Sequence, residues 1–255
     1  MRKQSAKYIL PFLCLAFSAC SSPYRVTNVQ RTRILIDARY DKPLDNETAD
    51  FMKPFIQEVD KLTKPTLGEA GQYLDVDRPE SLLGNLLPDI LMWGAKFYDE
   101  KPDFAVYNIG GMRSSIPKGV VTVGDIYDVA PFENKICFVT LLGEQVSELF
   151  QQIARRGGEG VSSEVRIVMD KDFKVIDMSV GGKPIDAGAR YRVVTIDYVS
   201  HGNDNMVAFL KATDRRELTS DKDISRNIIM EYFKEKSAQG LKVESKLEGR
   251  IKIEQ

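Results

Sequence analysis

Hydrophobic and polar positions along this chain repeat with the period of α-helices over several segments. In the segment 81–98, leucine, isoleucine and alanine residues recur at helical spacing and form a broad apolar face, which predicts the strongest helix of the chain. Shorter apolar stripes of the same period predict further helices. These lie at residues 46–62, where Asn46 or Thr48 is expected to cap the first turn, and at residues 124–129, 143–154 and 224–236.

Other segments alternate between apolar and polar residues or form short apolar runs, as β-strands do. Gly181 and Gly182 predict a turn between two of these strands. Helices and strands follow one another irregularly, so we expect an α+β (mixed α/β) fold in which helices pack on a mixed β-sheet. A single domain is expected over residues 31–255. The predicted strands are 31–38, 104–107, 135–142, 165–169, 175–180, 191–197 and 242–253.

The N-terminus has the pattern of an export signal. Basic residues precede an apolar run at residues 8–17, which is too short to cross a membrane. Small residues then precede Cys20, as in the bacterial lipoprotein signal, which this segment resembles. We therefore expect a signal peptide at residues 1–19, a tether at residues 20–30 with lipid on Cys20, and an exported protein anchored to a membrane of the cell envelope and facing the periplasm. In the alternative interpretation an ordinary secretory signal is cut near Ala19.

Composition narrows the classes of function. The chain has 255 residues, of which 43% are hydrophobic, and this is sufficient for a sizeable core. The 36 basic and 37 acidic residues give a net charge of −1, so no basic field exists to hold a long polyanion, and nucleic acid is not an expected partner. Cys137 is the one cysteine left after Cys14 is assigned to the signal and Cys20 to the lipid, so no internal disulfide is expected.

Motifs for independent catalysis are missing from the sequence. A two-metal phosphatase needs several imidazoles and carboxylates around its metal ions, and His201 is the only histidine. No P-loop, Gly-x-Gly-x-x-Gly fingerprint or Gly-x-Ser-x-Gly elbow occurs. We therefore expect no catalytic residue, no metal ligand and no cofactor in this chain.

Three short clusters combine glycine, aromatic and polar residues in a way that a simple core does not require. At 108–113, glycines after a predicted strand allow either a ligand or a tight turn, and Arg113 lies just past them. At 130–134, Pro131 restricts the backbone before Phe132. This aromatic side chain is either a platform for a planar base or a plug in the core.

The third cluster, at 196–204, begins at the end of a predicted strand and enters a polar loop. Tyr198 can face Phe132 across a base, and the carboxylate of Asp204 can accept hydrogen bonds from ribose hydroxyls. In the alternative interpretation Asp204 only begins the next turn.

In their order and spacing, these clusters resemble the C-terminal domain of the 5'-nucleotidase family. The resemblance extends over residues 67–253 and implies the fold of that domain. The family's metallophosphatase domain, with its two metals and its catalytic Asp-His pair, has no counterpart in the sequence. The matching motifs are Asn-x-Gly-Gly-x-Arg at 108–113, Pro-Phe-x-Asn at 131–134 and Tyr-Arg-Val-x-Thr at 191–195, followed by an aromatic residue and a Gly-x-Asp loop.

The resemblance implies substrate-binding roles in all three clusters. Phe132 and Tyr198 occupy the places of two aromatic residues that sandwich the base. Asp204 matches the acidic residue that holds the ribose hydroxyls. Arg113 matches an arginine near the sugar and phosphate, and Asn134 matches an asparagine near the base.

Two further substrate-binding candidates are Gly111, in the first cluster, and Arg78, whose spacing matches the family more loosely. The loop around Asp204 departs from the Gly-Gly-Asp-Gly that the family usually has, because residues 202–205 read Gly-Asn-Asp-Asn. Asparagine tolerates the left-handed conformation better than most residues, so we expect the turn to be kept. Tyr198 stands where the family more commonly has Phe, and its ring can still stack on a base.

We expect this chain to be the nucleotide- or nucleoside-recognition part of a 5'-nucleotidase-type hydrolase that acts in nucleotide catabolism and salvage. Hydrolysis of the phosphoric monoester is expected only with a separate metallophosphatase chain, which would carry the divalent metals. Two alternatives stay open. The chain is a nucleotide- or nucleoside-binding lipoprotein without an enzymatic partner, or it is a structural remnant whose pocket is closed.

Overall fold

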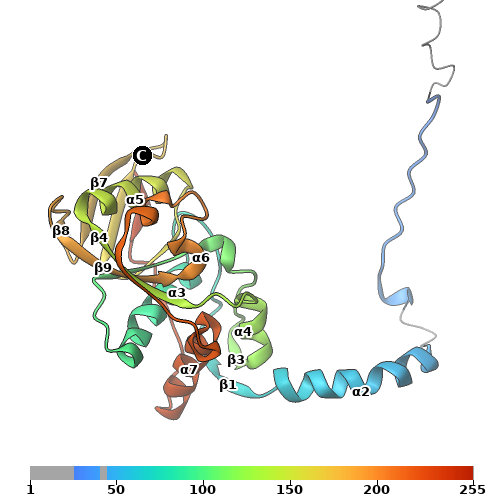
Figure 1. Ribbon diagram of the computed structural model, residues 1–255. Helices are drawn as coiled ribbons and strands as arrows, with labels where there is room; N and C mark the ends of the chain where they lie inside the picture. The colour runs from blue at the N-terminus through green and yellow to red at the C-terminus, as the bar shows by residue number, and fades with distance from the viewer. Residues whose placement is uncertain (1–25, 41–44, 255) are drawn as a thin grey trace, which may run out of the picture. The chain divides into compact units, whose positions relative to one another are not determined.

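The computed structural model describes residues 26–40 and 45–254 (Figure 1). The expected signal peptide and the expected lipidation at Cys20 lie outside the described residues. The chain divides into two units, of which the first ends at Phe51 and the second begins at Met52. Within the described residues, no helix has both the length and the apolar character needed to span a bilayer.

The described part of the first unit corrects the prediction of a strand at 31–38. The segment forms no strand, and a short 3-10 helix, η1 (Ala38–Tyr40), begins at its last residue. Ile34 and Ile36 are exposed, so the alternating pattern has neither a partner strand nor a covered face among the described residues. A single strand without these partners is not stable in water, which is why alternation alone misled the prediction.

Helix α2 (Asn46–Thr63) confirms the helix predicted at 46–62. Its cap differs from the prediction. The carboxylate of Asp45, and not a side chain of Asn46 or Thr48, accepts the hydrogen bond of the first turn, from the backbone N–H of Thr48 at 3.2 Å. An aspartate just before a helix accepts hydrogen bonds from the N–H groups of the first turn, which have no partner within the helix. Its negative charge is also stabilised by the positive end of the helix dipole.

A five-stranded sheet forms the centre of the second unit, in the order β10-β4-β9-β2-β5. β9 pairs antiparallel with β4 and parallel with β2, so the sheet is mixed, as the sequence predicts. Six of the seven residues of β4 are buried, because helices cover both faces of the sheet. The strands are β2 (Phe104–Tyr107), β4 (Ile136–Leu142), β5 (Gly160–Val161), β9 (Arg190–Ile196) and β10 (Thr213–Glu217).

Two smaller sheets flank the central sheet. In one, β1 (Thr66–Ala70) pairs antiparallel with β3 (Gly119–Thr122). The other has the order β11-β6-β7-β8 and contains the glycine turn predicted between strands, where Gly181 and Gly182 have φ values of 58° and 73°. Its strands are β6 (Val165–Met169), β7 (Val175–Val180), β8 (Lys183–Pro184) and β11 (Ile251–Ile253).

The strand predicted at 242–253 is much shorter than expected, since only β11 and an isolated bridge between Ala70 and Val243 form. Between Val243 and β11, backbone groups form hydrogen bonds with side chains that lie just before helix α3 or in its first turn. Asn85 donates to the carbonyl of Lys246 at 2.8 Å, and Glu80 accepts from the N–H of Glu248 at 2.9 Å. Because side chains satisfy these backbone groups, the segment needs no strand partner.

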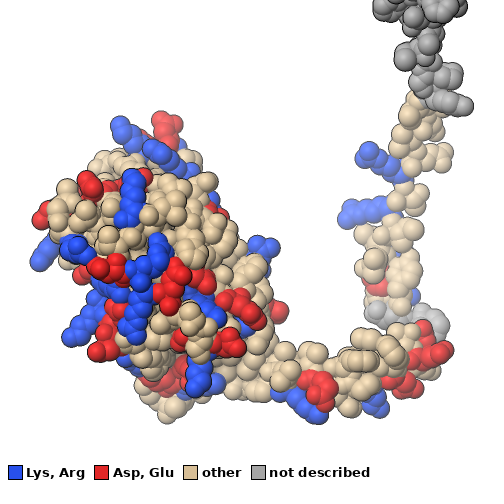
Figure 2. All heavy atoms as spheres, in the orientation of Figure 1, with Lys and Arg blue, Asp and Glu red and all other residues tan. Residues whose placement is uncertain are grey.

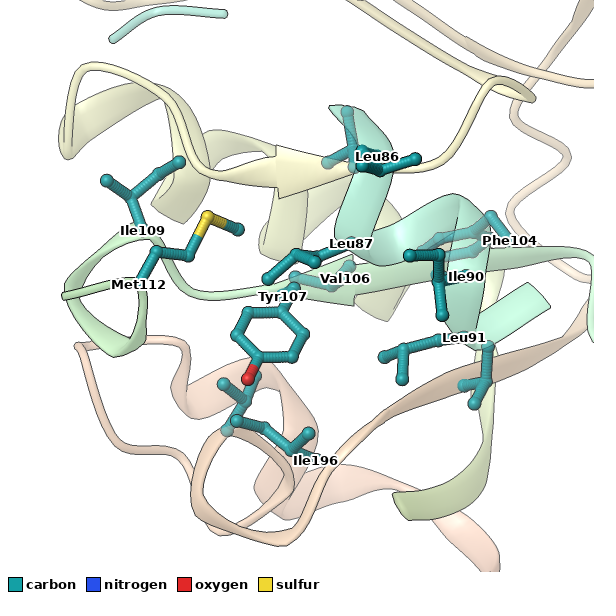
Figure 3. Packing of buried hydrophobic residues seen from close by; sticks show 14 of the residues in the cluster. Leu86, Leu87, Ile90, Leu91, Phe104, Val106, Tyr107, Ile109, Met112 and Ile196 are labelled. Atoms are coloured by element: carbon teal, nitrogen blue, oxygen red, sulfur yellow. The ribbon is translucent and has the colours of Figure 1, made fainter. Parts of the chain in front are cut away.

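Helix α3 (Leu82–Gly94) and the 3-10 helix η2 (Ala95–Tyr98) together confirm the strongest predicted helix. The hydroxyl of Ser81 caps α3 by accepting from the N–H of Gly84 at 3.2 Å. In Figure 3, Leu87 and Ile90 of α3 pack beside Val106 and Tyr107 of β2. This contact forms part of the hydrophobic core on one face of the sheet.

The other helices complete the layers. In Figure 1, α5 lies above the central sheet, and α3 and α7 lie below it. The helices predicted at 124–129, 143–154 and 224–236 are confirmed as α4, α5 and α7, and the expected α+β class is confirmed with them. The remaining helical elements are η3 (Ile109–Gly111), α4 (Val123–Val129), α5 (Gly143–Arg155), α6 (Asp197–Ser200), η4 (Val207–Lys211), η5 (Asp221–Asp223) and α7 (Ser225–Ala238).

Candidate functional site

Sheet topology brings the three sequence clusters to one end of the central sheet. Ile136, the first residue of β4, pairs with Ile196, the last residue of β9, so the loop before β4 and the helix α6 after β9 are neighbours. The N–H of Asp197 donates to the carbonyl of Lys135 at 2.9 Å and joins them. β2 runs parallel to β9, so η3, which follows β2, lies at the same end.

The three clusters line one pocket of about 410 Å³. This volume is within the range of small-molecule sites. Six of the seven residues predicted to bind substrate lie in its wall, and Arg78 does not. The lining residues are Asn108, Gly110, Gly111, Arg113, Phe132, Asn134, Tyr198 and Asp204.

Two aromatic side chains of the pocket are half exposed. Phe132 is 48% exposed and Tyr198 is 41% exposed, whereas Phe138, on the neighbouring strand β4, is fully buried. The interpretation of Phe132 as a plug in the core is therefore wrong. The pocket is open to solvent, which also argues against the remnant with a closed pocket.

Arg226, at the start of α7, holds the backbone of the Phe132 loop. Its Nη1 donates to the carbonyl oxygens of Ala130, Pro131 and Phe132 at 3.1, 3.0 and 3.3 Å. Arg226 is 5% exposed, and its bond to Ala130 is buried, whereas its bonds to Pro131 and Phe132 are partly buried. Arg226 thus ties the loop that presents Phe132 to helix α7. Sequence reasoning missed Arg226, because nothing in its local sequence points to a loop about 95 residues away.

The loop that carries Asp204 has an unusual backbone. Asp204 and Asn205 have φ values of 55° and 59°, and Gly202 has 80°. The amide of Asn203 donates to the carbonyl of Tyr198 at 2.8 Å and ties the loop to α6. Asp and Asn tolerate the left-handed conformation better than other non-glycine residues, so the turn forms although the sequence departs from the family pattern.

The carboxylate of Asp204 is held by two side chains. Oδ2 accepts from Nδ2 of Asn108 at 2.6 Å, and Oδ1 lies 3.2 Å from Nη2 of Arg156. An ionised carboxylate offers about four acceptor positions, so these contacts leave acceptor capacity for a ligand. Gly111 lies close beside this pair, and a Cβ there would lie 2.7 Å from Oδ1 of Asn108 and displace that side chain.

Arg78 lies behind the pocket and does not line it. Its Nη2 donates to Oε1 of Glu159 at 2.7 Å, and its Nε donates to the carbonyl of Gly158 at 2.8 Å. Glu159 also accepts from Arg156, the partner of Asp204. Sequence reasoning missed both Arg156 and Glu159. One sequence signal could have pointed to Glu159, because it is a lone charged residue between Gly158 and Gly160. A charge between two glycines indicates a specific partner.

His201 pairs with a carboxylate on the surface. Its Nε2 lies 2.7 Å from Oε1 of Glu217, and its side chain is 55% exposed. In the part of the chain that the structure describes, no group of three or more His, Cys, Asp or Glu side chains is placed to hold a metal ion. Basic and acidic side chains are interspersed on the face of the second unit shown in Figure 2. That face therefore has no large basic field.

Comparison with known proteins places this chain in a family. The model of the 5'-nucleotidase C-terminal domain matches residues 60–211, which is more than half of the chain. The chain belongs to this family, and the resemblance inferred from the sequence motifs is confirmed.

Individual relatives agree with this assignment. The chain is 28% identical to a 5'-nucleotidase of Vibrio parahaemolyticus over 169 residues, covering 63% of this chain and 29% of the relative. It is also 28% identical to the trifunctional nucleotide phosphoesterase YfkN of Bacillus subtilis over 228 residues, covering 83% of this chain and 15% of the relative. Thus the chain spans about a third or less of these curated relatives.

Among solved structures, a 5'-nucleotidase precursor of Thermus thermophilus is similar with a TM-score of 0.70 and 28% identity. The alignment covers 83% of this chain and 44% of that protein. A Haemophilus influenzae NAD nucleotidase has a TM-score of 0.61 at 19% identity, which supports the fold alone.

Proposed function

We propose that this chain recognises the nucleoside part of a nucleotide whose phosphate is hydrolysed by a separate metallophosphatase chain, as a step of nucleotide catabolism and salvage. One observation carries the proposal. Two half-exposed aromatic side chains, Phe132 and Tyr198, share a pocket of about 410 Å³ with the carboxylate of Asp204. An apolar pair next to a fixed acceptor suits a base joined to a sugar.

The base would stack on Phe132 and Tyr198. Stacking of a base on an aromatic side chain is worth about 1–3 kcal/mol, and it requires that the ring be held in place. Arg226 supports this role because it holds the Phe132 loop in one conformation. Asn134, in the same wall, offers both a donor and an acceptor for the edge of the base.

The ribose would bind to Asp204, whose carboxylate retains acceptor capacity for the sugar hydroxyls. Arg113 lies in the same wall and is exposed, and among residues 26–40 and 45–254 its guanidinium donates one weak bond, to the carbonyl of Gly110 at 3.3 Å. A guanidinium with donors to spare suits a phosphate oxygen. With these assignments, the base, the sugar and the phosphate would all bind within one pocket.

Hydrolysis would depend on the partner chain. Bound divalent metals supply an activated water and stabilise charge on the phosphate. The residues of this chain would contribute by binding the nucleoside and holding the phosphate in one position, which lowers the entropic cost of the reaction. The single histidine of the chain, His201, supports this division of labour, because it is paired with Glu217 outside the pocket.

The proposal is tested by calorimetric titration of the purified chain with AMP and adenosine, followed by assay of phosphate release after addition of histidine-rich metallophosphatases from the same cells. We expect binding of both ligands, and hydrolysis that rises when the matching phosphatase is present. Binding without any gain in hydrolysis would favour a binding lipoprotein that has no enzymatic partner. The absence of binding would refute the recognition role.

The same proposal includes export and anchoring by lipid on Cys20. The motivating feature is the short apolar run followed by small residues and this cysteine. Cells that express the chain and are fed a clickable fatty acid should label it, and Cys20→Ser should abolish the label and release the protein from the membrane fraction. Unchanged labelling of Cys20→Ser would contradict the assignment.

A further inference from the structure

Glu159 is a buried carboxylate between the pocket and the protein interior. Its side chain is fully buried, yet it accepts three hydrogen bonds. Oε1 accepts from Nη2 of Arg78 at 2.7 Å and from Nε of Arg156 at 2.6 Å, and Oε2 accepts from the N–H of Ile109 at 2.5 Å. A buried charge is costly unless it is paired, and here two guanidinium groups and one amide satisfy it.

Two of these partners belong to the pocket wall or touch it. Arg156 extends from Glu159 to Oδ1 of Asp204, at 3.2 Å, so negative, positive and negative groups alternate along the line. Ile109 is the first residue of η3, the turn that carries Gly110 and Gly111 into the pocket. The buried carboxylate of Glu159 therefore bonds both to Arg156, the partner of Asp204, and to the backbone of the turn that carries Gly110 and Gly111.

The backbone of Glu159 is itself fixed by its neighbours. A Cβ on Gly158 would lie 2.3 Å from the carbonyl oxygen of Pro79, and Gly158 has a φ of 114°. A Cβ on Gly160 would lie 2.8 Å from the carbonyl oxygen of Tyr107. Both glycines allow a close backbone approach that no other residue permits, so the carboxylate is held in one place.

We propose that Glu159 is a positioning residue that, through Arg156, sets the orientation of the Asp204 carboxylate and so makes the pocket prefer a nucleoside to a free base. The inference rests on the proposed function, because it assigns the ribose to Asp204. Without the carboxylate of Glu159, Arg156 would lose one of its two ion-pair partners and keep the carboxylate of Asp204. The guanidinium would then move toward Asp204 and compete with the sugar hydroxyls for its acceptor positions.

The test compares adenosine with adenine in calorimetric titrations of wild type, Glu159→Gln and Arg156→Lys. Wild type should bind adenosine more tightly than adenine. In Glu159→Gln this preference should fall by about tenfold or more, because a charge-assisted contact to the sugar is lost, while adenine binding should change little. Arg156→Lys keeps the charge, loses the planar fork and should show the same direction of change, and it serves if Glu159→Gln does not fold.

Glu100→Gln is the matched control, since Glu100 is also paired with an arginine and mostly buried but lies outside the pocket lining. It should lower thermal stability and leave the preference for adenosine unchanged. A merely structural role of Glu159 predicts equal losses for adenosine and adenine, and this result would overturn the inference.

A second readout needs no ligand. In Glu159→Gln, NMR should show faster hydrogen exchange at the Ile109 amide, which loses a charged acceptor, and shifted amide signals at Gly110 and Asp204. Unchanged signals would refute the positioning role. If wild type binds neither adenosine nor adenine while these amides change as expected, the positioning role stands and the proposed function fails.

Discussion

Replacing Phe132 by alanine separates ligand binding from stability. Phe132 lines the pocket and is 48% exposed, so about half of its apolar surface is already in water. Full burial of such a side chain is worth about 1.5–3 kcal/mol, and the substitution should therefore lower the free energy of unfolding by only about 1 kcal/mol. Loss of one stacking platform should weaken base binding by about 1–3 kcal/mol, which is roughly a 5- to 150-fold rise in Kd.

Calorimetry with adenosine and urea denaturation of the same preparations measure the two effects. Phe97→Ala is the matched control, because Phe97 is 53% exposed, lies outside the pocket lining and contacts Trp93 edge to face with ring centroids 5.1 Å apart. It should leave the Kd unchanged. Phe138→Ala is the opposite control: this ring is fully buried, and its loss should cost about 3–5 kcal/mol of stability.

The reasoning would be refuted if Phe132→Ala bound adenosine as wild type does, since the ring would then not contact the base. A loss of stability as large as that of Phe138→Ala would refute the prediction of a small stability effect, because it would mean that Phe132 contributes mainly to the core. Equal weakening by Phe97→Ala and Phe132→Ala would show a general effect on the fold rather than stacking in the pocket.

Two further predictions concern stability. Gly143→Ala should lower the urea midpoint by the equivalent of about 1–3 kcal/mol, because its Cβ would overlap the carbonyl oxygen of Asp186 at 1.8 Å, whereas Gly188→Ala, with 3.7 Å to the nearest atom, should cost far less. Equal midpoints for the two variants would contradict the steric argument. Glu100→Gln should destabilise the protein at pH 7 by about 1–3 kcal/mol, because Arg192 bonds both carboxylate oxygens, at 2.6 and 2.9 Å. Hydrogen bonding to Arg192 lowers the pKa of Glu100, so its contribution is fully present above the ordinary glutamate pKa of about 4.3 and is lost as pH falls through the lower folded value. The difference between Glu100→Gln and wild type in urea titrations should therefore shrink toward pH 3, and a constant difference would count against the ion pair.

Elements with strong local signals were predictable. Helix α3 carries both its apolar face and its cap, Ser81, within its own sequence. Strand β4 is a continuous run of apolar and β-branched residues, and β9 ends in such a run at residues 193–196. β10 was missed because its sequence, Thr-Asp-Arg-Arg-Glu, is polar. An edge strand of this kind is defined by its pairing with β4 and not by burial.

The strand predicted at 31–38 shows the converse error. Its alternation of Ile34 and Ile36 with polar residues satisfies the local rule, yet the segment has no partner among the described residues. A strand requires hydrogen bonds from another part of the chain, and no local pattern guarantees them.

By itself, the sequence determined the residues that could contact a ligand, because motif, spacing and residue type are local properties. Phe132, Tyr198 and Asp204 were recognised in this way, and all three line the pocket. The count of one histidine also led to the prediction that this chain holds no histidine-rich metal centre.

Only the tertiary structure decided how these residues are held. The amide of Asn108 meets Asp204 across 96 residues of sequence, Glu159 meets Ile109 across 50, and Arg226 reaches the Phe132 loop across about 95. Such contacts depend on which strands pair and in which direction, and long-range pairing leaves no trace in the spacing of the residues it joins. For this reason the ligand-facing residues could be read from the chain, whereas the buried charges that orient them became visible only when β2, β4, β5 and β9 were assembled into one sheet.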